Sequence, residues 1–167
     1  ALASTSISIG PTGSVYVTCD SLPQGHGHKT ILSQIVADVF GIKINDVFVN
    51  TTHDTHKDAW SIAAGNYSSR FAGAVAGSAF NAANNLKKKL QKIAASQLNC
   101  KSENVLFDKE KVYDKKNSDN YLNFKRLAGI PHWSPGNLPE KLNPSLKETV
   151  FWGNEKLRPP NEKDEIN

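Results

Sequence analysis

A glycine-rich stretch that leads directly into a predicted helix is the clearest candidate for chemistry in this sequence. The candidate ligand-contacting residues in it are Gln24, Gly25, His26, Gly27, His28 and Thr30. Glycines let a backbone approach an anion closely, and the free N–H groups of a helix N-terminus favour phosphate. The spacing matches neither G-x-G-x-x-G nor G-x-x-x-x-G-K-[ST]. Two interpretations therefore stay open: a phosphate cradle, or a glycine-assisted turn with Thr30 near a helix cap.

A second polar segment, which begins at Gly65, precedes the other long predicted helix. It places two hydroxyls and a cation, from Ser68, Ser69 and Arg70, at the start of that helix. Either serine is a competent N-cap, which is a purely structural interpretation. The alternative is that the two helix N-termini converge on one anionic ligand.

The histidines offer a different chemistry. His26 and His28 lie two residues apart, and His53, Asp54 and His56 lie close together further along the chain. Imidazoles with a carboxylate form an acceptable ligand set for Zn²⁺, provided that the two segments meet. A small histidine-based metal site is therefore an alternative hypothesis.

The elements that would position these loops follow from hydrophobic patterning. Apolar residues fall on one stripe from His28 to Phe40, which predicts a helix that Gly41 ends. A second, alanine-rich helix is expected over about residues 69–98. The other predicted elements are a hairpin within 6–19, strands at 47–49, 105–107 and 112–113, and a helical turn at 124–128. This order predicts an α+β fold, with two helices packed on one face of a mixed or antiparallel sheet.

The C-terminal part of the chain is rich in proline. Six of the eight prolines fall within residues 131–167, which predicts an extended arm that follows a domain spanning residues 1–130. The arm carries Trp133, Phe151 and Trp152, so we expect it to run along a neighbouring polypeptide rather than fold back into its own core.

Composition excludes several classes of protein. The chain has 167 residues, 38% hydrophobic residues, a formal charge of +4 and no apolar run long enough to cross a membrane. Basic residues are mixed with acidic ones, and no known nucleic-acid-binding module accompanies them, so nucleic acid is not an expected partner. Two cysteines without a C-x-x-C spacing, and a start without a basic, apolar leader, indicate a cytoplasmic protein.

Taken together, the motifs resemble the molybdenum-binding large subunit of the xanthine dehydrogenase, aldehyde oxidase and carbon monoxide dehydrogenase family. The order and spacing agree over about residues 5–160. The matching motifs are Pro23-Gln24-Gly25-x-Gly27-His28-x-Thr30, Gln34-Ile35-Val36-Ala37-Asp38, Gly41-Ile42, Asp46-Val47, Asp54-Thr55, Gly65-x-Tyr67-x-Ser69-Arg70, Phe124-x-x-Leu127-Ala128, Leu138-Pro139, Pro144-x-Leu146-x-x-Thr149 and Pro159-Pro160.

The resemblance implies a cofactor and a site. In that family molybdenum sits on a pyranopterin, molybdopterin, whose phosphate or cytosine dinucleotide tail is gripped by loops of the large subunit. It implies that residues 24–30 form one such loop and residues 65–70 another, and that the protein supplies no direct metal ligand here. One position departs from the family pattern, because His26 stands where the family has Gln, an amide that contacts the pterin.

The resemblance also implies that the chain is one part of a larger oxidoreductase. The family's catalytic glutamate lies downstream of the proline-rich linker, and iron–sulfur and flavin modules complete the enzyme. We therefore expect no turnover from this chain alone, and association with the remaining large-subunit polypeptide, with the iron–sulfur and flavin partners, and with itself when isolated. The expected substrates are an aldehyde, a purine-like compound or carbon monoxide. A non-catalytic assembly module of the same fold is the alternative.

Overall fold

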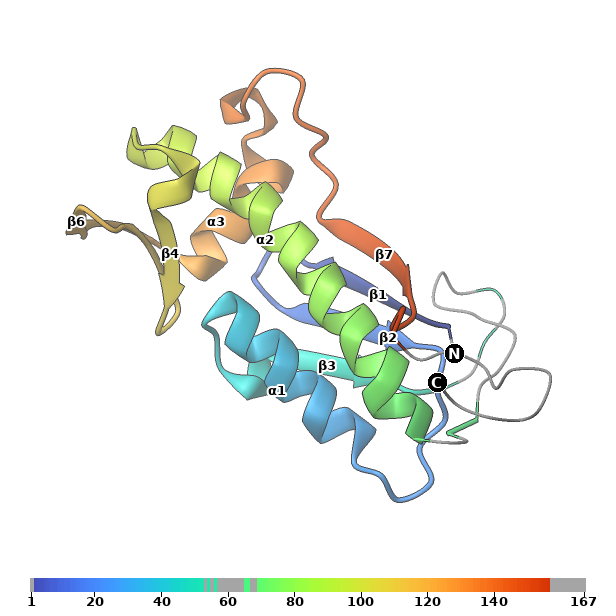
Figure 1. Cartoon of the computed structure of the whole chain (residues 1–167). Helices are drawn as coiled ribbons and strands as arrows, with labels where there is room; N and C mark the ends of the chain where they lie inside the picture. Colours follow the sequence, from blue (N-terminus) through green and yellow to red (C-terminus); the bar gives the residue numbers. More distant parts are fainter. Residues whose placement is uncertain (1, 53, 55, 57–64, 67–68, 157–167) are drawn as a thin grey trace.

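The chain folds as an α+β unit in which two helices cover one face of a four-stranded sheet, as the sequence predicted (Figure 1). The structure is a computed structural model, and it describes residues 2–52, 54, 56, 65, 66 and 69–156. The strand order in the main sheet is β3-β2-β1-β7. The bounds of these strands are Ala3–Ile9 for β1, Val15–Cys19 for β2, Val47–Asn50 for β3 and Lys147–Trp152 for β7.

The predicted hairpin is confirmed as strands β1 and β2. Its turn is closed by two backbone bonds, from Gly10 N–H to the Ser14 carbonyl (2.9 Å) and from Gly13 N–H to the Gly10 carbonyl (3.0 Å). Gly13 has a positive φ of 87°, which a side chain would resist. Strand β3 then pairs with β2 in parallel, which requires a crossover, and helix α1 supplies it.

Helix α1 spans His28–Phe40, the range that the apolar stripe predicts. Gly41 ends it in the left-handed conformation (φ 63°), and its N–H bonds back to the carbonyls of Ala37 and Asp38. This is the C-terminal cap expected of a glycine. The other end of α1 therefore points its unpaired N–H groups toward the loop that follows β2.

The second long helix begins with a π-helical turn, η3 (Phe71–Val75), and continues as α2 (Ala76–Leu98). Its small residues let it lie directly on the sheet: Ser78 and Thr5 of β1 share a buried hydrogen bond of 2.6 Å. Gly77 faces the Trp152 indole so closely that a Cβ there would overlap the ring. Within the described residues, no helix combines the length and the apolar character needed to cross a membrane.

A second sheet packs near the C-terminal half of α2. It consists of β4 (Val105–Asp108), β5 (Lys111–Asp114) and β6 (Asn117–Asn123), all antiparallel. Helix α3 (Phe124–Trp133) follows β6, and short 3-10 turns occur at Ile44–Asp46, Ser102–Asn104 and Pro135–Asn137. The β5–β6 hairpin projects from the body of the molecule (Figure 1).

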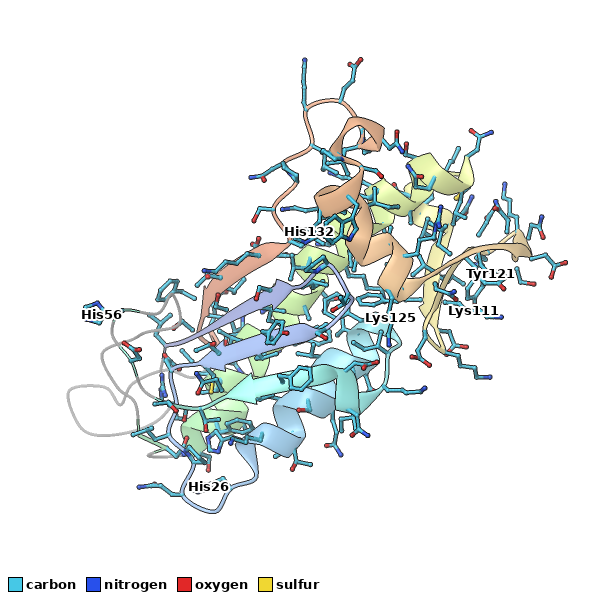
Figure 2. The ribbon with its side chains drawn as sticks, turned by 180° about the vertical axis from the view of Figure 1, so that it is seen from behind. His26, His56, Lys111, Tyr121, Lys125 and His132 are labelled. Carbon is cyan, nitrogen blue, oxygen red and sulfur yellow. The ribbon has the colours of Figure 1, made fainter. Side chains whose placement is uncertain are left out.

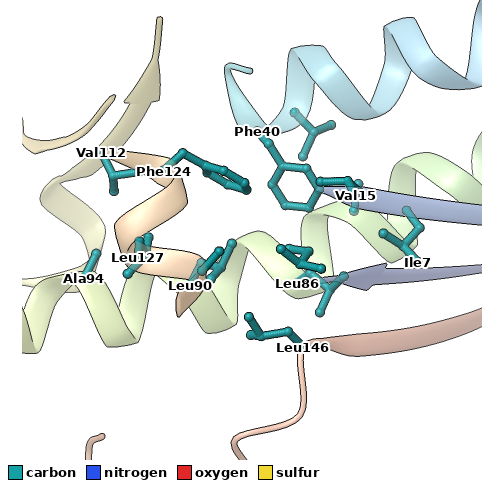
Figure 3. Close-up of a cluster of buried hydrophobic side chains, with 14 of the residues drawn as sticks. Ile7, Val15, Phe40, Leu86, Leu90, Ala94, Val112, Phe124, Leu127 and Leu146 are labelled. Carbon is teal, nitrogen blue, oxygen red and sulfur yellow. The ribbon is translucent and has the colours of Figure 1, made fainter. Parts of the chain in front are cut away.

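The hydrophobic core joins both sheets to the helices (Figure 3). Phe40 of α1 and Phe124 of α3 contact each other, with ring centroids 5.6 Å apart. Leu86 and Leu90 of α2 are fully buried beside them. One continuous core therefore fixes α1, α2 and α3 relative to the sheet that carries the loops.

The expectation of an extended arm that leaves its own domain is wrong for residues 138–152. β7 pairs with β1 in antiparallel register, from Ala3 opposite Trp152 to Ser8 opposite Lys147. Leu146 is buried in the core, and Leu138 and Leu142 pack against it. Four of the six prolines, at positions 131, 135, 139 and 144, precede the strand, the other two follow it, and none lies within it, so they cost it no ladder hydrogen bond. Helix α3 also runs across the predicted boundary between residues 130 and 131.

Candidate cofactor-binding site

The loop from Gln24 to Gly27 presents an open helix N-terminus. Gly25 (φ 83°) and Gly27 (φ 71°) are both left-handed, and Gly27 is the N-cap of α1 without any side-chain cap. A Cβ at either glycine would meet no described atom within 4 Å. The first turn of α1 also carries no acidic residue. A group that seeks backbone N–H donors can therefore approach this helix end directly.

His28, the first residue of α1, lies beneath this loop and is fully buried. Its Nε2 is 3.2 Å from Asn66 Oδ1, and the Ser21 hydroxyl donates to the same oxygen at 2.7 Å. Asn66 Nδ2 donates to the Leu22 carbonyl (2.8 Å), which fixes the orientation of the amide. Because an amide oxygen only accepts, Nε2 carries the proton of the His28 ring.

The environment of His28 keeps the imidazole neutral. Burial lowers its pKa below the ordinary value of 6.5, and the positive charge that nearby His26 can carry lowers it further, against the opposing hydrogen bond to Asn66. The ring packs edge-on against Phe71, with centroids 4.1 Å apart. Its Nδ1 is a buried acceptor without a hydrogen-bond partner among the described residues. Burial thus favours the neutral form of the His28 ring, which packs beside Phe71 under the loop.

Asn66 ties the second polar segment to the first. Its amide contacts Ser21, Leu22 and His28, which flank the glycine-rich loop on both sides. Figure 1 shows the loop between β2 and α1 at the same end of the molecule as the segment that enters α2. Asn66 therefore brings the entry segments of the two helices together, and their convergence on one anionic ligand stays a prediction.

Arg70 is committed to an internal network. Its NH2 group lies 2.8 Å from Asp20 Oδ2, and the two side chains are 2% and 0% exposed. The guanidinium also donates to the Leu2 carbonyl from Nε (3.2 Å) and NH2 (2.9 Å), and to the Gly65 carbonyl at 3.4 Å. Asp20 Oδ2 accepts a further bond from the Ser4 N–H. These contacts join the start of β1, the end of β2 and the entry to α2.

The residue before Arg70 has an unusual backbone. Ser69 has a φ of 58°, which is uncommon for a residue other than glycine, and the π-helical turn η3 begins two residues later. Left-handed residues and π-turns both occur often at functional sites. Ser69 is exposed.

The other predicted site residues are distributed as follows. Gln24, Gly25, His26, Gly27 and Thr30 are exposed, His28 and Arg70 are buried, and Ser68 lies outside the described residues. Asn66, Ser21 and Asp20 are members of the site that the sequence did not single out. Asn66 occupied an unassigned position between Gly65 and Tyr67, and only the fold shows what it bonds.

The geometry does not favour the histidine-based metal site. In the described part of the chain, no group of three or more His, Cys, Asp or Glu side chains could hold a metal ion. His26 and His56 lie on well-separated loops (Figure 2). His53, the remaining predicted ligand, lies outside the described residues.

Comparison with known proteins finds similar sequences and structures. A family model described as a molybdopterin cofactor-binding domain matches residues 1–167. The chain is 30% identical over 158 residues to the carbon monoxide dehydrogenase large chain of Afipia carboxidovorans, covering 95% of this chain and 18% of that protein. It is 28% identical to the nicotine 6-hydroxylase large subunit of Paenarthrobacter nicotinovorans, covering 87% of this chain and 18% of that subunit.

Solved structures show the same similarity. Quinoline 2-oxidoreductase from Pseudomonas putida superimposes with a TM-score of 0.84 and 27% identity, over 92% of this chain and 19% of that one. Carbon monoxide dehydrogenase from Oligotropha carboxidovorans gives a TM-score of 0.79 and 28% identity, over 92% and 18%. The chain thus spans about a fifth of the length of the relatives it matches. The resemblance found in the sequence motifs is confirmed, and the chain belongs to the molybdopterin cofactor-binding domain family.

Proposed function

We propose that the two converging loops hold the phosphate-bearing tail of molybdopterin within a larger oxidoreductase. The observation that carries this proposal is the Asn66 bridge, which sets the second loop against the uncapped N-terminus of α1. A phosphate needs N–H donors and space, and the glycine loop provides both, while the first turn of α1 carries no acidic residue. The residues present therefore fit the tail of the cofactor.

We divide the site residues into two roles. The exposed residues Gln24, Gly25, His26, Gly27, Thr30 and Ser69, together with Ser68, contact the cofactor or its phosphates. His28 and Arg70 hold the loops from beneath, since both side chains are buried and His28 is hydrogen-bonded to Asn66 while Arg70 is paired with Asp20. Where the family has an amide, His26 presents an imidazole, which can donate one hydrogen bond and accept one but lacks the reach of the amide.

The cofactor, when bound, supplies the redox chemistry that transfers water-derived oxygen to a carbon centre. This chain contributes binding and orientation, and we assign no catalytic residue to it. We propose that activity toward an aldehyde, a purine-like compound or carbon monoxide needs the rest of the large subunit and the iron–sulfur and flavin partners. The complex is proposed to be cytoplasmic, and its cofactor to carry the cytosine dinucleotide tail.

The test is cofactor binding by the purified chain, with molybdenum and pterin measured after reconstitution. Gly25→Ala and Gly27→Ala should each lower the amount of bound pterin, because a methyl group would occupy the space left for the ligand. Gly136→Ala is the control for a methyl group added in open space away from the loops, and unfolding curves control for the strain that alanine meets at the positive φ of Gly25 and Gly27. Equal pterin content in all these variants would contradict the proposed site.

A substitution of His26 distinguishes this proposal from the alternative, an assembly module without affinity for the cofactor. His26→Gln should tighten pterin binding about fivefold, the worth of roughly one net hydrogen bond of about 1 kcal/mol. If neither wild type nor this variant retains pterin, the assembly module is the better description. Stoichiometric zinc in place of pterin would instead support the metal site.

A further inference from the structure

A groove at the opposite end of the molecule from the cofactor loops is lined by α3, the β1–β2 turn and the end of α2. Its volume is about 290 Å³, and Lys125, Arg126, Trp133, Pro11, Gln97 and Asn137 contribute to its walls. Figure 2 shows Lys125 and His132 on α3, far from His26 of the cofactor loop. We propose that this groove, here called the α3 groove, binds a short acidic peptide segment of a partner polypeptide.

Trp133 is the first observation in support. Its side chain is 75% exposed, more than that of any other large hydrophobic residue in the described chain. The indole lies close to Gly129, where a Cβ would come within 3.1 Å of Trp133 Cδ1. Glycine at this position thus lets the ring form one wall of the groove. Exposed tryptophan in a concave surface is typical of a residue that anchors a partner.

The charge of the groove is the second observation. Lys125 and Arg126 both line it, no carboxylate does, and neither cation forms an ion pair with any described residue. The Lys125 stem packs on Gly13 of the β1–β2 turn. Two cations that form no ion pair within the described part of the chain, beside an aromatic wall, are complementary to carboxylates.

Polar groups for a peptide backbone are also present. Gln97 Nε2 donates to the Asn137 carbonyl (3.2 Å), so the Gln97 amide oxygen remains as an acceptor in the groove wall. The Asn137 side chain adds a donor and an acceptor. A backbone with acidic side chains can therefore be bound along its length. A nucleic acid would need a longer basic track and further stacking residues than this groove offers.

The experiment measures fluorescence anisotropy of a short dye-labelled peptide of Asp, Glu and Leu, titrated with the full chain. A peptide of equal length with Asn and Gln replacing the acids is the control ligand. We expect the acidic peptide to bind at least about tenfold more tightly, since charge-assisted contacts are about twice as strong as neutral ones. Lys125→Gln with Arg126→Gln, and Trp133→Ala alone, should each weaken binding about tenfold.

The matched control variant is Lys115→Gln with Lys116→Gln. It removes the same charge from the exposed β5–β6 turn, outside the groove, and should change affinity less than about twofold. Unchanged thermal unfolding curves, measured by circular dichroism, would show that every variant is folded.

Three results would overturn the proposal: no binding of the acidic peptide, equal loss in both charge variants, or equal affinity for the amide peptide. Displacement of the peptide by a lower concentration of a single-stranded oligonucleotide would reassign the groove to nucleic acid. The groove and the cofactor loops lie at opposite ends, so pterin content tests one site and anisotropy the other.

Discussion

The pair formed by Arg70 and Asp20 makes the sharpest prediction for stability. Replacing Arg70 with Met removes the charge but keeps much of the volume, and it leaves the Asp20 carboxylate buried with only Ser4 as a donor. Breaking a buried ion pair from one side costs about 3–5 kcal/mol, because the remaining charge is uncompensated. The lost bonds to the Leu2 and Gly65 carbonyls act in the same direction.

The assay is urea unfolding of wild type and variants, followed by circular dichroism. Asp20→Asn should be destabilising to a similar extent. The double variant should lower the free energy of unfolding by less than the two single variants added together, because each single change leaves the partner's charge buried without an ion pair. The control is Lys43→Ala, which breaks a surface ion pair between Lys43 Nζ and Glu110 Oε2 (3.1 Å). The side chains of Lys43 and Glu110 are 71% and 34% exposed. That pair should contribute no more than about 1 kcal/mol.

The outcome bears directly on the cofactor site. A cost for Arg70→Met as small as that for Lys43→Ala would refute the view that Arg70 serves an internal network. If such a variant also lost pterin binding at full stability, Arg70 would be a direct phosphate contact, as the sequence alone first indicated.

Three further perturbations test other parts of the structure. Burial lowers the pKa of His28 in the folded state, so the unfolded state binds the proton more readily. The free energy of unfolding should therefore fall as pH drops below about 6.5. In thermal melts, His28→Gln should weaken this pH dependence, and the control His132→Gln, at an exposed position, should leave it unchanged. Gly77→Ala should cost about 1–3 kcal/mol in urea unfolding because the new methyl overlaps the Trp152 ring, and a cost near zero would show that the ring moves aside freely. Deleting residues 131–167 removes β7 from the edge of the main sheet and should lower the melting temperature. A truncated chain as stable as the full one would show that β7 contributes little to stability.

The sequence predicted the elements whose patterns are strongly periodic. The stripe from His28 to Phe40, ended by Gly41, gives both bounds of α1 correctly. The hairpin around Gly10 and Gly13 is likewise confirmed, since its turn residues and alternating strands leave little choice of register.

Two strands were missed for identifiable reasons. β6 is built mostly from Asn, Ser and Asp, which have poor strand propensity, and pairing with β5 decides its conformation. β7 follows a proline-rich stretch, and its partner β1 lies more than a hundred residues earlier in the chain. Long-range pairing of this kind is set by the core beneath the sheet, where Leu146 is buried, and local sequence does not show it.

The candidate site was predictable in its loops and not in its supports. Glycine spacing and the start of an apolar stripe indicated the uncapped N-terminal end of α1, where we propose that the anion binds. Asn66 and Asp20 acquire their roles only through contacts with residues 38 and 50 positions away, respectively. The burial of Arg70 could not be predicted from the sequence either, because a cation next to a helix start is consistent with both a ligand contact and an internal ion pair.

The most direct test of the central claim is hydrogen–deuterium exchange of the full chain with and without reconstituted molybdopterin. If the loops hold the tail of the cofactor together, amides of residues 24–31 and of residues 65–71 should both exchange more slowly when it is bound. The amides of the β5–β6 hairpin, which projects from the other end, should be unaffected. Slower exchange at neither loop, with cofactor demonstrably bound, would contradict the account.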